Sequence, residues 1–214
     1  MQSHKTKGFT ILELLISLSI IVLLATITVF ELRNSRRTEE LRTASRRVSA
    51  DLRGMQSRAL SAKNLKTCTT PTADLAVCEF STAVCGANPC AESIPSAYGV
   101  VFTASSYQYT MFADINPSSG VDYRYSDAGE IYLQQSILPL ETDYVIVDQI
   151  TADGAPVASV DISFMRQSGT VRMFHPGVPP AAEPSLIRIR LLHTLTGSTA
   201  EIEINRITGR ISIL

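Results

Sequence analysis

The sequence lacks the short motifs that mark the common enzyme classes. It contains no GxSxG elbow of a serine hydrolase, no phosphate-binding P-loop and no GxGxxG dinucleotide fingerprint. Two of its three histidines, His175 and His193, stand in no motif with a candidate partner. We therefore predict no catalytic site and no cofactor, and we expect both histidines to be ordinary surface or packed residues.

Charge is scarce and unevenly placed. Charged residues make up 18% of the 214 residues, and the formal net charge is −1. Residues 1–67 hold 12 Lys and Arg against 5 Asp and Glu, a net +7, whereas residues 68–214 hold 7 against 15, a net −8. The acidic body argues against binding nucleic acid with the whole domain, because phosphate binding needs positive charge. The 45% hydrophobic content excludes a wholly disordered chain.

Helix breakers are missing from the start of the chain. No proline precedes Pro71, and Gly54 is the only glycine between Phe9 and Lys66. Residues 14–30 carry no charge, and this uncharged segment is long enough to span a bilayer. The run ends without the small-residue cleavage site of a secretory signal peptide and continues into a polar helical segment. This pattern favours a retained membrane anchor over a signal peptide, and its length and uniform apolarity favour an anchor over a buried helix.

One acidic residue interrupts the apolar run. Gly8, Phe9 and Glu13 follow a short basic leader and precede the long apolar helix. This arrangement resembles the type IV prepilin signature. The resemblance implies that a membrane prepilin peptidase cuts the Gly8–Phe9 bond and N-methylates Phe9. Because a carboxylate in a membrane helix costs about 2.5–3.5 kcal/mol, Glu13 needs a purpose. It is expected to neutralise the new α-amine on its own or a neighbouring subunit and so to set the register of assembly.

The prepilin resemblance implies that the leader lies in the cytoplasm, but the distribution of arginine opposes this orientation. The leader holds only Lys5 and Lys7, whereas six arginines follow the span within residues 31–47. The positive-inside rule alone favours a cytoplasmic body. We expect a periplasmic body instead, because the prepilin resemblance implies a cytoplasmic leader and the downstream cysteines suit an oxidising compartment. The protein is thus expected in the inner membrane as a single-pass chain.

The helix is expected to continue to about Lys66. One stripe with helical spacing is formed by Leu41, Ser45, Val48, Leu52, Met55, Ala59 and Ala62. The stripe has little bulk, which suits a helix that lies on a sheet. Arginines occupy most of the other faces, and this basic surface is equally compatible with anionic lipid headgroups, acidic neighbours or plain solvation.

Four cysteines lie close together in the segment that follows. Cys68, Cys78, Cys85 and Cys90 allow three disulfide pairings, and their spacing does not choose among them. The CxxC spacing typical of zinc sites is absent, so we predict two disulfides and no metal. Around Asp114 several acidic and polar residues follow a turn, but the sixth position that an EF-hand reserves for glycine is Ser119. We interpret that segment as a polar turn.

After Ser96 the hydrophobic period changes to two, which predicts strands. The expected strands are 97–103, 107–113, 130–135, 144–149, 160–166, 170–174, 186–192, 200–205 and 210–214. Two of them predict their own register, since Arg188 opposite Glu203 also sets Arg190 opposite Glu201 in an antiparallel pair. The charged face of this pair is expected to be exposed, and the isoleucine face to lie in the core.

These elements predict an α+β fold in which a long N-terminal membrane-spanning helix packs on antiparallel sheets. The expected organisation is a leader at 1–8, a span at 9–30, an exposed helix at 31–66, a cysteine loop at 67–96 and a β body at 97–214. Residues 55–59, 98–102, 111–116 and 205–211 are similar to the corresponding segments of GspH/FimT-type minor pseudopilins, so the fold is expected to be pilin-like.

The resemblance implies a structural subunit. It would copolymerise with other pilins or pseudopilins through its apolar helix, in a type II secretion pseudopilus or a type IV pilus, which the sequence does not separate. The alternative is a FimT-like minor pilin that takes up DNA through basic residues near the C-terminus, here Arg206 and Arg210. The acidic body disfavours this alternative.

Overall fold

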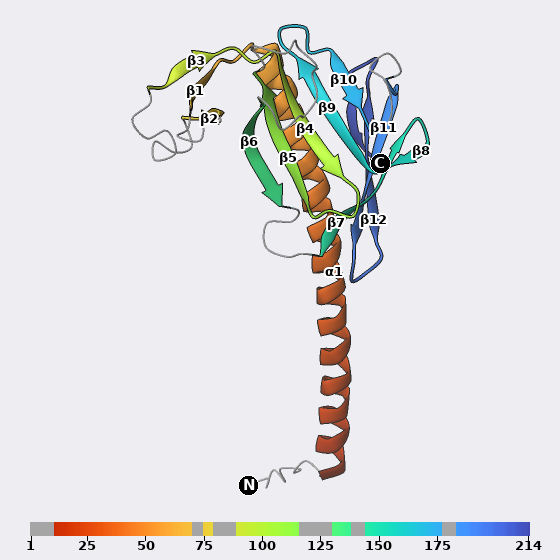
Figure 1. Cartoon of the computed structure of the whole chain (residues 1–214). Coiled ribbons are helices and arrows are strands. Elements are labelled where there is room, and N and C mark those ends of the chain that lie inside the picture. Colours follow the sequence, from red (N-terminus) through yellow and green to blue (C-terminus); the bar gives the residue numbers. More distant parts are fainter. Residues whose placement is uncertain (1–10, 70–74, 79–88, 116–129, 138–143, 177–182) are drawn as a thin grey trace, which may run out of the picture. The chain divides into compact units, whose positions relative to one another are not determined.

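The computed structural model describes residues 11–69, 75–78, 89–115, 130–137, 144–176 and 183–214 (Figure 1). The chain divides into two compact units, Met1–Glu39 and Glu40–Leu214. Helix α1, Ile11–Leu60, runs through both units. The first unit contains the apolar N-terminal turns of α1. The second unit contains the rest of α1 and all the strands that the structure describes.

The second unit is built from three antiparallel sheets. Its strands are β1 Leu65–Thr69, β2 Leu75–Val77, β3 Ala91–Ser93, β4 Ala97–Thr103, β5 Gln108–Asp114, β6 Glu130–Ile137, β7 Val145–Ala152, β8 Ala155–Val157, β9 Ser159–Met165, β10 Val171–Phe174, β11 Leu186–His193, β12 Thr199–Asn205 and β13 Ile211–Ile213. The strand orders are β2-β1-β3, β10-β9-β4-β5-β6 and β13-β12-β11-β7-β8. The predicted α+β class, a long apolar helix with antiparallel sheets, is confirmed.

The apolar stripe of α1 forms one wall of the core. Leu41, Ser45, Val48, Leu52, Met55 and Ala59 are buried as predicted, whereas Ala62 lies beyond the helix and is half-buried. The apolar members of this stripe belong to a single cluster with the inward side chains of both five-stranded sheets. Burying a side chain such as Leu52 contributes about 1.5–3 kcal/mol, so the sheets hold this half of the helix in place.

The helix ends at Leu60, so the prediction that it continues to about Lys66 was wrong. Groups from the β9–β10 turn and from β4 bind backbone carbonyls on either side of this end. The Gln167 N–H donates to the Ala59 carbonyl at 2.9 Å, and the Tyr98 hydroxyl donates to the Lys63 carbonyl at 2.6 Å. Ala62 adopts a φ of 51°, which turns the chain out of the helix and into β1. Long-range hydrogen bonds therefore override the local helical pattern.

The predicted register of β11 and β12 is confirmed. Arg188 lies opposite Glu203 and Arg190 opposite Glu201, and the alternating isoleucines are buried. The Arg188 Nε lies 3.1 Å from a Glu203 carboxylate oxygen. Arg190 instead donates from Nε to Asp148 on β7 at 2.7 Å. The two arginines of β11 thus form ion pairs with both neighbouring strands, Arg188 with β12 and Arg190 with β7.

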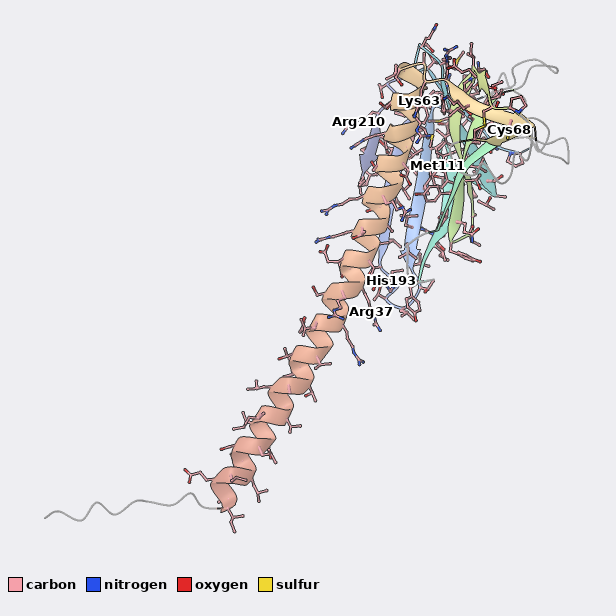
Figure 2. The ribbon with its side chains drawn as sticks, turned by 90° about the vertical axis from the view of Figure 1, so that its left-hand side faces the viewer. Arg37, Lys63, Cys68, Met111, His193 and Arg210 are labelled. Carbon is pink, nitrogen blue, oxygen red and sulfur yellow. A yellow bond between two sulfur atoms is a disulfide. The ribbon has the colours of Figure 1, made fainter. Side chains whose placement is uncertain are left out.

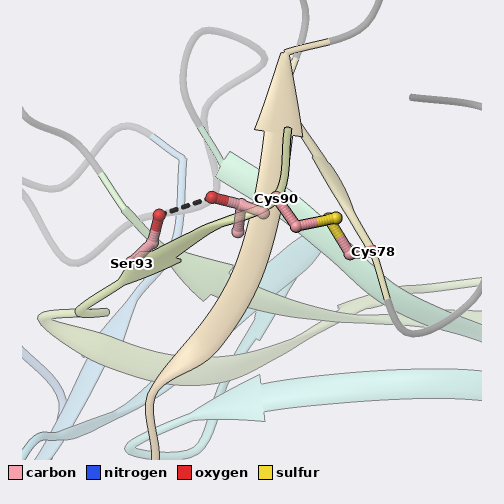
Figure 3. Close-up of a disulfide and its surroundings, with 4 residues drawn as sticks. Cys78, Cys90 and Ser93 are labelled. Atoms are coloured by element: carbon pink, nitrogen blue, oxygen red, sulfur yellow. Dashed lines mark hydrogen bonds between the residues drawn. A yellow bond between two sulfur atoms is a disulfide. The ribbon is translucent and has the colours of Figure 1, made fainter. Parts of the chain in front are cut away.

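The cysteine segment contains strands that the sequence pattern did not predict. β1 pairs with β2 and β3, and the Cys78–Cys90 disulfide joins the residues that flank β2 and β3 (Figure 3). Thr67 and Ser93 hydrogen-bond across the β1–β3 pair. Cys68 is also disulfide-bonded, and Cys85 lies outside the described residues. The prediction of disulfides is confirmed for Cys68, Cys78 and Cys90.

Gly99 in the middle of β4 has no room for a side chain. A Cβ there would overlap the Phe112 ring and lie 2.8 Å from the Ile162 carbonyl oxygen. We expect Gly99→Ala to lower the free energy of unfolding by about 1–3 kcal/mol, because overpacking a filled core forces backbone shifts. Urea unfolding of the detergent-solubilised chain, followed by circular dichroism, measures this change.

Gly54 supplies the matched control. A Cβ at this helical position meets no atom within 4 Å among the described residues. Gly54→Ala is therefore expected to raise stability by up to about 1 kcal/mol through helix propensity. Equal stability of the two alanine variants would contradict the proposed close packing at Gly99.

Candidate functional site

The first turns of α1 present apolar side chains on every side. Every large apolar residue described from Ile11 to Leu32 is at least 50% exposed, and Ile11 reaches 82%. A helix that is apolar all round requires lipid or other apolar helices around it, because water solvates it poorly. Within the described residues, α1 is the one helix long and apolar enough to cross a membrane, and none of its most apolar window is buried.

The few hydroxyl groups in this stretch bond to their own helix. Ser17 donates to the Glu13 backbone carbonyl at 2.7 Å, and Ser19 donates to the Leu15 carbonyl at 2.8 Å. Thr26 and Thr28 make the same kind of bond about two to three turns further along, each at 2.8 Å. These bonds satisfy polar groups internally, which hydrocarbon surroundings demand. The segment is therefore chemically suited to a membrane or to a bundle of apolar helices.

Glu13 is the acidic residue in the first turn of α1. On the next turn Ile16 is exposed, and Ser17 donates to the Glu13 backbone carbonyl. Gly8 and Phe9, the proposed cleavage and methylation positions, lie outside the described residues. The structure thus places Glu13 at the start of the apolar stretch, and the roles of Gly8, Phe9 and Glu13 remain proposals.

The arginines singled out for DNA binding lie at the β12–β13 turn. Arg206 donates from Nε to the Pro184 carbonyl at 3.1 Å, and its Nη1 lies 4.0 Å from a carboxylate oxygen of Glu183. Glu183 is 7% exposed and forms its close ion pair with Arg172, so Arg206 lies at the edge of an existing ion pair. Arg210 is exposed, and its backbone N–H donates to the Thr208 hydroxyl at 3.3 Å. The Arg206 side chain is thus bound within the body.

A small open pocket of about 310 Å³ lies beside this turn. Gln56 from α1, Ser168 and Thr170 from the β9–β10 turn and Arg206 and Thr208 from the β12–β13 turn supply its polar groups. Gln56 already donates to the Gly209 carbonyl at 3.3 Å. In the described part of the chain, no cluster of three or more His, Cys, Asp or Glu residues could hold a metal ion.

The two histidines differ in their surroundings. His175 is partly exposed beside Pro176. His193 is fully buried, and its Nε2 lies 3.1 Å from a Glu40 carboxylate oxygen of α1 (Figure 2). Tyr144 stacks against the His193 ring with a centroid distance of 6.2 Å. His193 therefore helps to join β11 to the helix, a role that the sequence did not indicate because Glu40 lies 153 residues away.

The polar turn predicted around Asp114 lies largely outside the described residues. Asp114 itself is fully buried at the end of β5 and accepts a hydrogen bond from the Ser96 hydroxyl at 2.7 Å. This contact ties β5 to the start of β4. Asp114 thus has a structural role in the described part of the molecule.

Comparison with known proteins identifies the N-terminal segment. The prokaryotic N-terminal methylation motif matches residues 3–29. No curated protein and no solved structure matches the chain. The motif implies processing by prepilin peptidase and assembly with other pilins, and proteins of this kind are structural rather than enzymatic. Together with the exposed apolar helix, the match supports membrane anchoring and a type IV pilin-like protein.

Proposed function

We propose that this protein is a minor pseudopilin or minor pilin of the GspH/FimT type, which copolymerises through α1 into a type II secretion pseudopilus or a type IV pilus. The observation that supports this most directly is the methylation motif over residues 3–29, which coincides with the part of α1 where every large apolar side chain that the structure describes is at least 50% exposed. A filament of packed helices supplies the apolar surroundings that this surface requires.

In this proposal the leader stays in the cytoplasm and the body lies in the periplasm, with α1 in the inner membrane until assembly. Prepilin peptidase cuts the Gly8–Phe9 bond and methylates Phe9. Glu13 then pairs with the α-amine of a neighbouring subunit. Two charges that are each costly in hydrocarbon offset one another in this pair, and the pair defines the axial position of the incoming helix.

Site-specific photocross-linking tests the proposed assembly. A photoreactive amino acid replaces Leu18, an exposed apolar residue of α1, in cells that express the whole assembly system. We expect cross-links to other pilin-like subunits, and we expect these to disappear when prepilin peptidase is deleted. Cross-links that persist unchanged without the peptidase, or none to any pilin-like subunit, would contradict the proposal.

DNA uptake through Arg206 and Arg210 is the alternative role. It is less favoured, because the Arg206 guanidinium already donates to the Pro184 carbonyl and has Glu183 at 4.0 Å, and because residues 68–214 carry a net −8. A gel shift at several salt concentrations separates the roles. A DNA binder loses affinity steeply as salt rises, and Arg210→Gln reduces that salt slope.

A further inference from the structure

Three arginines follow the apolar stretch of α1 within little more than one helical turn. Arg33 and Arg36 are exposed, and Arg37, which is labelled in Figure 2, is half-buried. Among the residues that the structure describes, none of the three forms an ion pair. Arginine donates up to five hydrogen bonds in a planar fork that matches phosphate oxygens. This arginine cluster, Arg33, Arg36 and Arg37, is therefore able to bind an anionic partner.

The depth of the cluster matches one lipid headgroup layer. With a rise of about 1.5 Å per residue, Arg33 and Arg37 are separated by about 6 Å along the helix. A bilayer has a hydrocarbon core of about 30 Å and a total thickness of about 40–45 Å, which leaves about 5–7 Å of headgroups on each side. The large apolar residues end at Leu32, directly before Arg33. When the apolar stretch spans the hydrocarbon, the cluster lies among the phosphates at its C-terminal end.

The cluster also occupies one face of the helix. Positions i, i+3 and i+4 are neighbours on a helix surface, so the three side chains project together. Glu31 lies two residues earlier, on roughly the opposite side, since each residue advances about 100°. Glu40 approaches His193 of the body at 3.1 Å. Glu39 is exposed three residues after Arg36, so it is the nearest carboxylate to the cluster on the helix surface, and it lies about 3 Å beyond Arg37 along the axis.

We propose that Arg33, Arg36 and Arg37 bind the headgroups of anionic phospholipids and hold the helix at a defined depth in the membrane. The depth of the cluster and its single face favour lipid over an acidic protein neighbour, because all three helix positions fall in the one layer where phosphates are dense when the apolar stretch spans the hydrocarbon. Each arginine near an anionic surface contributes about fivefold to binding. The inference depends on the membrane span and not on the role in filaments.

Arg42 and Arg46 provide the matched control. Both are exposed arginines of the same helix, but they lie about 14 Å and 20 Å beyond Arg33, outside the headgroup layer. Arg33→Gln with Arg36→Gln and Arg42→Gln with Arg46→Gln remove the same charge, and glutamine preserves helix propensity. Circular dichroism of each variant checks that the fold is retained.

Native mass spectrometry of the full chain in nanodiscs tests the proposal. The nanodiscs contain equal amounts of phosphatidylglycerol and phosphatidylcholine, and the lipids retained on the protein are counted. We expect wild type and the Arg42/Arg46 variant to retain phosphatidylglycerol preferentially. In the Arg33/Arg36 variant this preference is expected to fall by roughly an order of magnitude, from about fivefold per arginine.

Two further measurements separate the possible partners. Millimolar inorganic phosphate is expected not to displace the bound phosphatidylglycerol; displacement would identify a general anion site and overturn the lipid proposal. Equal lipid preference in all variants would overturn it as well. If the Arg33/Arg36 variant keeps its lipids but loses the Leu18 cross-links to other subunits, the cluster binds an acidic protein neighbour and the lipid proposal is wrong.

Discussion

Gly8→Val is expected to leave the protein entirely as its precursor, still carrying the leader Met1–Gly8. Hydrolysis of the Gly8–Phe9 bond requires the peptidase to approach the backbone closely, and glycine offers no Cβ to obstruct that approach. A β-branched valine adds bulk on the scissile side and restricts the backbone as well. Intact-mass measurement of the membrane fraction distinguishes the precursor from the shorter mature chain.

Gly54→Ala is the control for this experiment, since it changes a glycine of α1 far from the scissile bond in sequence, and its added Cβ meets no neighbour within 4 Å among the described residues. It is expected to be processed like the wild type. If Gly8→Val were cut at the same bond with wild-type yield, the proposed recognition of Gly8 would be wrong. Because the precursor keeps its leader charges, the variant is also expected to be absent from assembled filaments.

Glu13→Ala is expected to be processed normally and yet to fail in assembly. The substitution removes the insertion penalty of the carboxylate, so the mature chain stays in the membrane at least as stably as the wild type. The amine of the neighbouring Phe9 then lacks its partner in a medium of low dielectric constant. An unsatisfied charged group in such surroundings costs more than a neutral one, so we expect at least a tenfold loss of cross-linked pairs.

Glu31→Ala is the matched control for Glu13→Ala. Glu31 is an exposed carboxylate of the same helix, but it stands at the far end of the apolar stretch. We expect its substitution to leave cross-linking at Leu18 within about twofold of the wild type. Normal cross-links and normal secretion or piliation in Glu13→Ala cells would mean that Glu13 takes no part in assembly.

Much of the fold is predictable from local patterns. The charges of β11 and β12 alternate with isoleucines, and this pattern predicts both the register and the buried face. The stripe from Leu41 to Ala59 likewise predicts which face of α1 packs on the sheets. In both cases the side chains that carry the signal are neighbours along one element, so a short window of sequence contains it.

Other features depend on contacts between distant segments. The end of α1 is determined by donors from Tyr98 and Gln167, which no helical pattern near Leu60 reveals. The strands β1, β2 and β3 are short, and the disulfide between Cys78 and Cys90 links their segments. Short strands of this kind give almost no periodicity, so the region is typical of a loop in sequence alone.

The candidate functional residues also fall into two groups, those recognisable from a local motif and those whose surroundings depend on distant segments. Gly8, Phe9 and Glu13 form a compact motif that is recognisable from sequence, and the match over residues 3–29 supports it. The DNA-binding hypothesis came from the resemblance to FimT-like minor pilins and was placed on the basic residues Arg206 and Arg210 by their position near the C-terminus. It could not anticipate Glu183, a nearly buried carboxylate from another segment that lies 4.0 Å from Arg206. Charge counted along the chain therefore does not predict charge available at the surface.

The N-terminal peptide of the mature protein tests the central claim most directly. The protein is isolated from membranes of cells that contain prepilin peptidase, digested, and measured by mass spectrometry. We expect the first residue to be Phe9, with the mass of one added methyl group on its α-amine. An intact chain that begins at Met1 in these cells, or an unmodified terminus at any other residue, would contradict the assignment of this protein to the pilin-like assembly pathway.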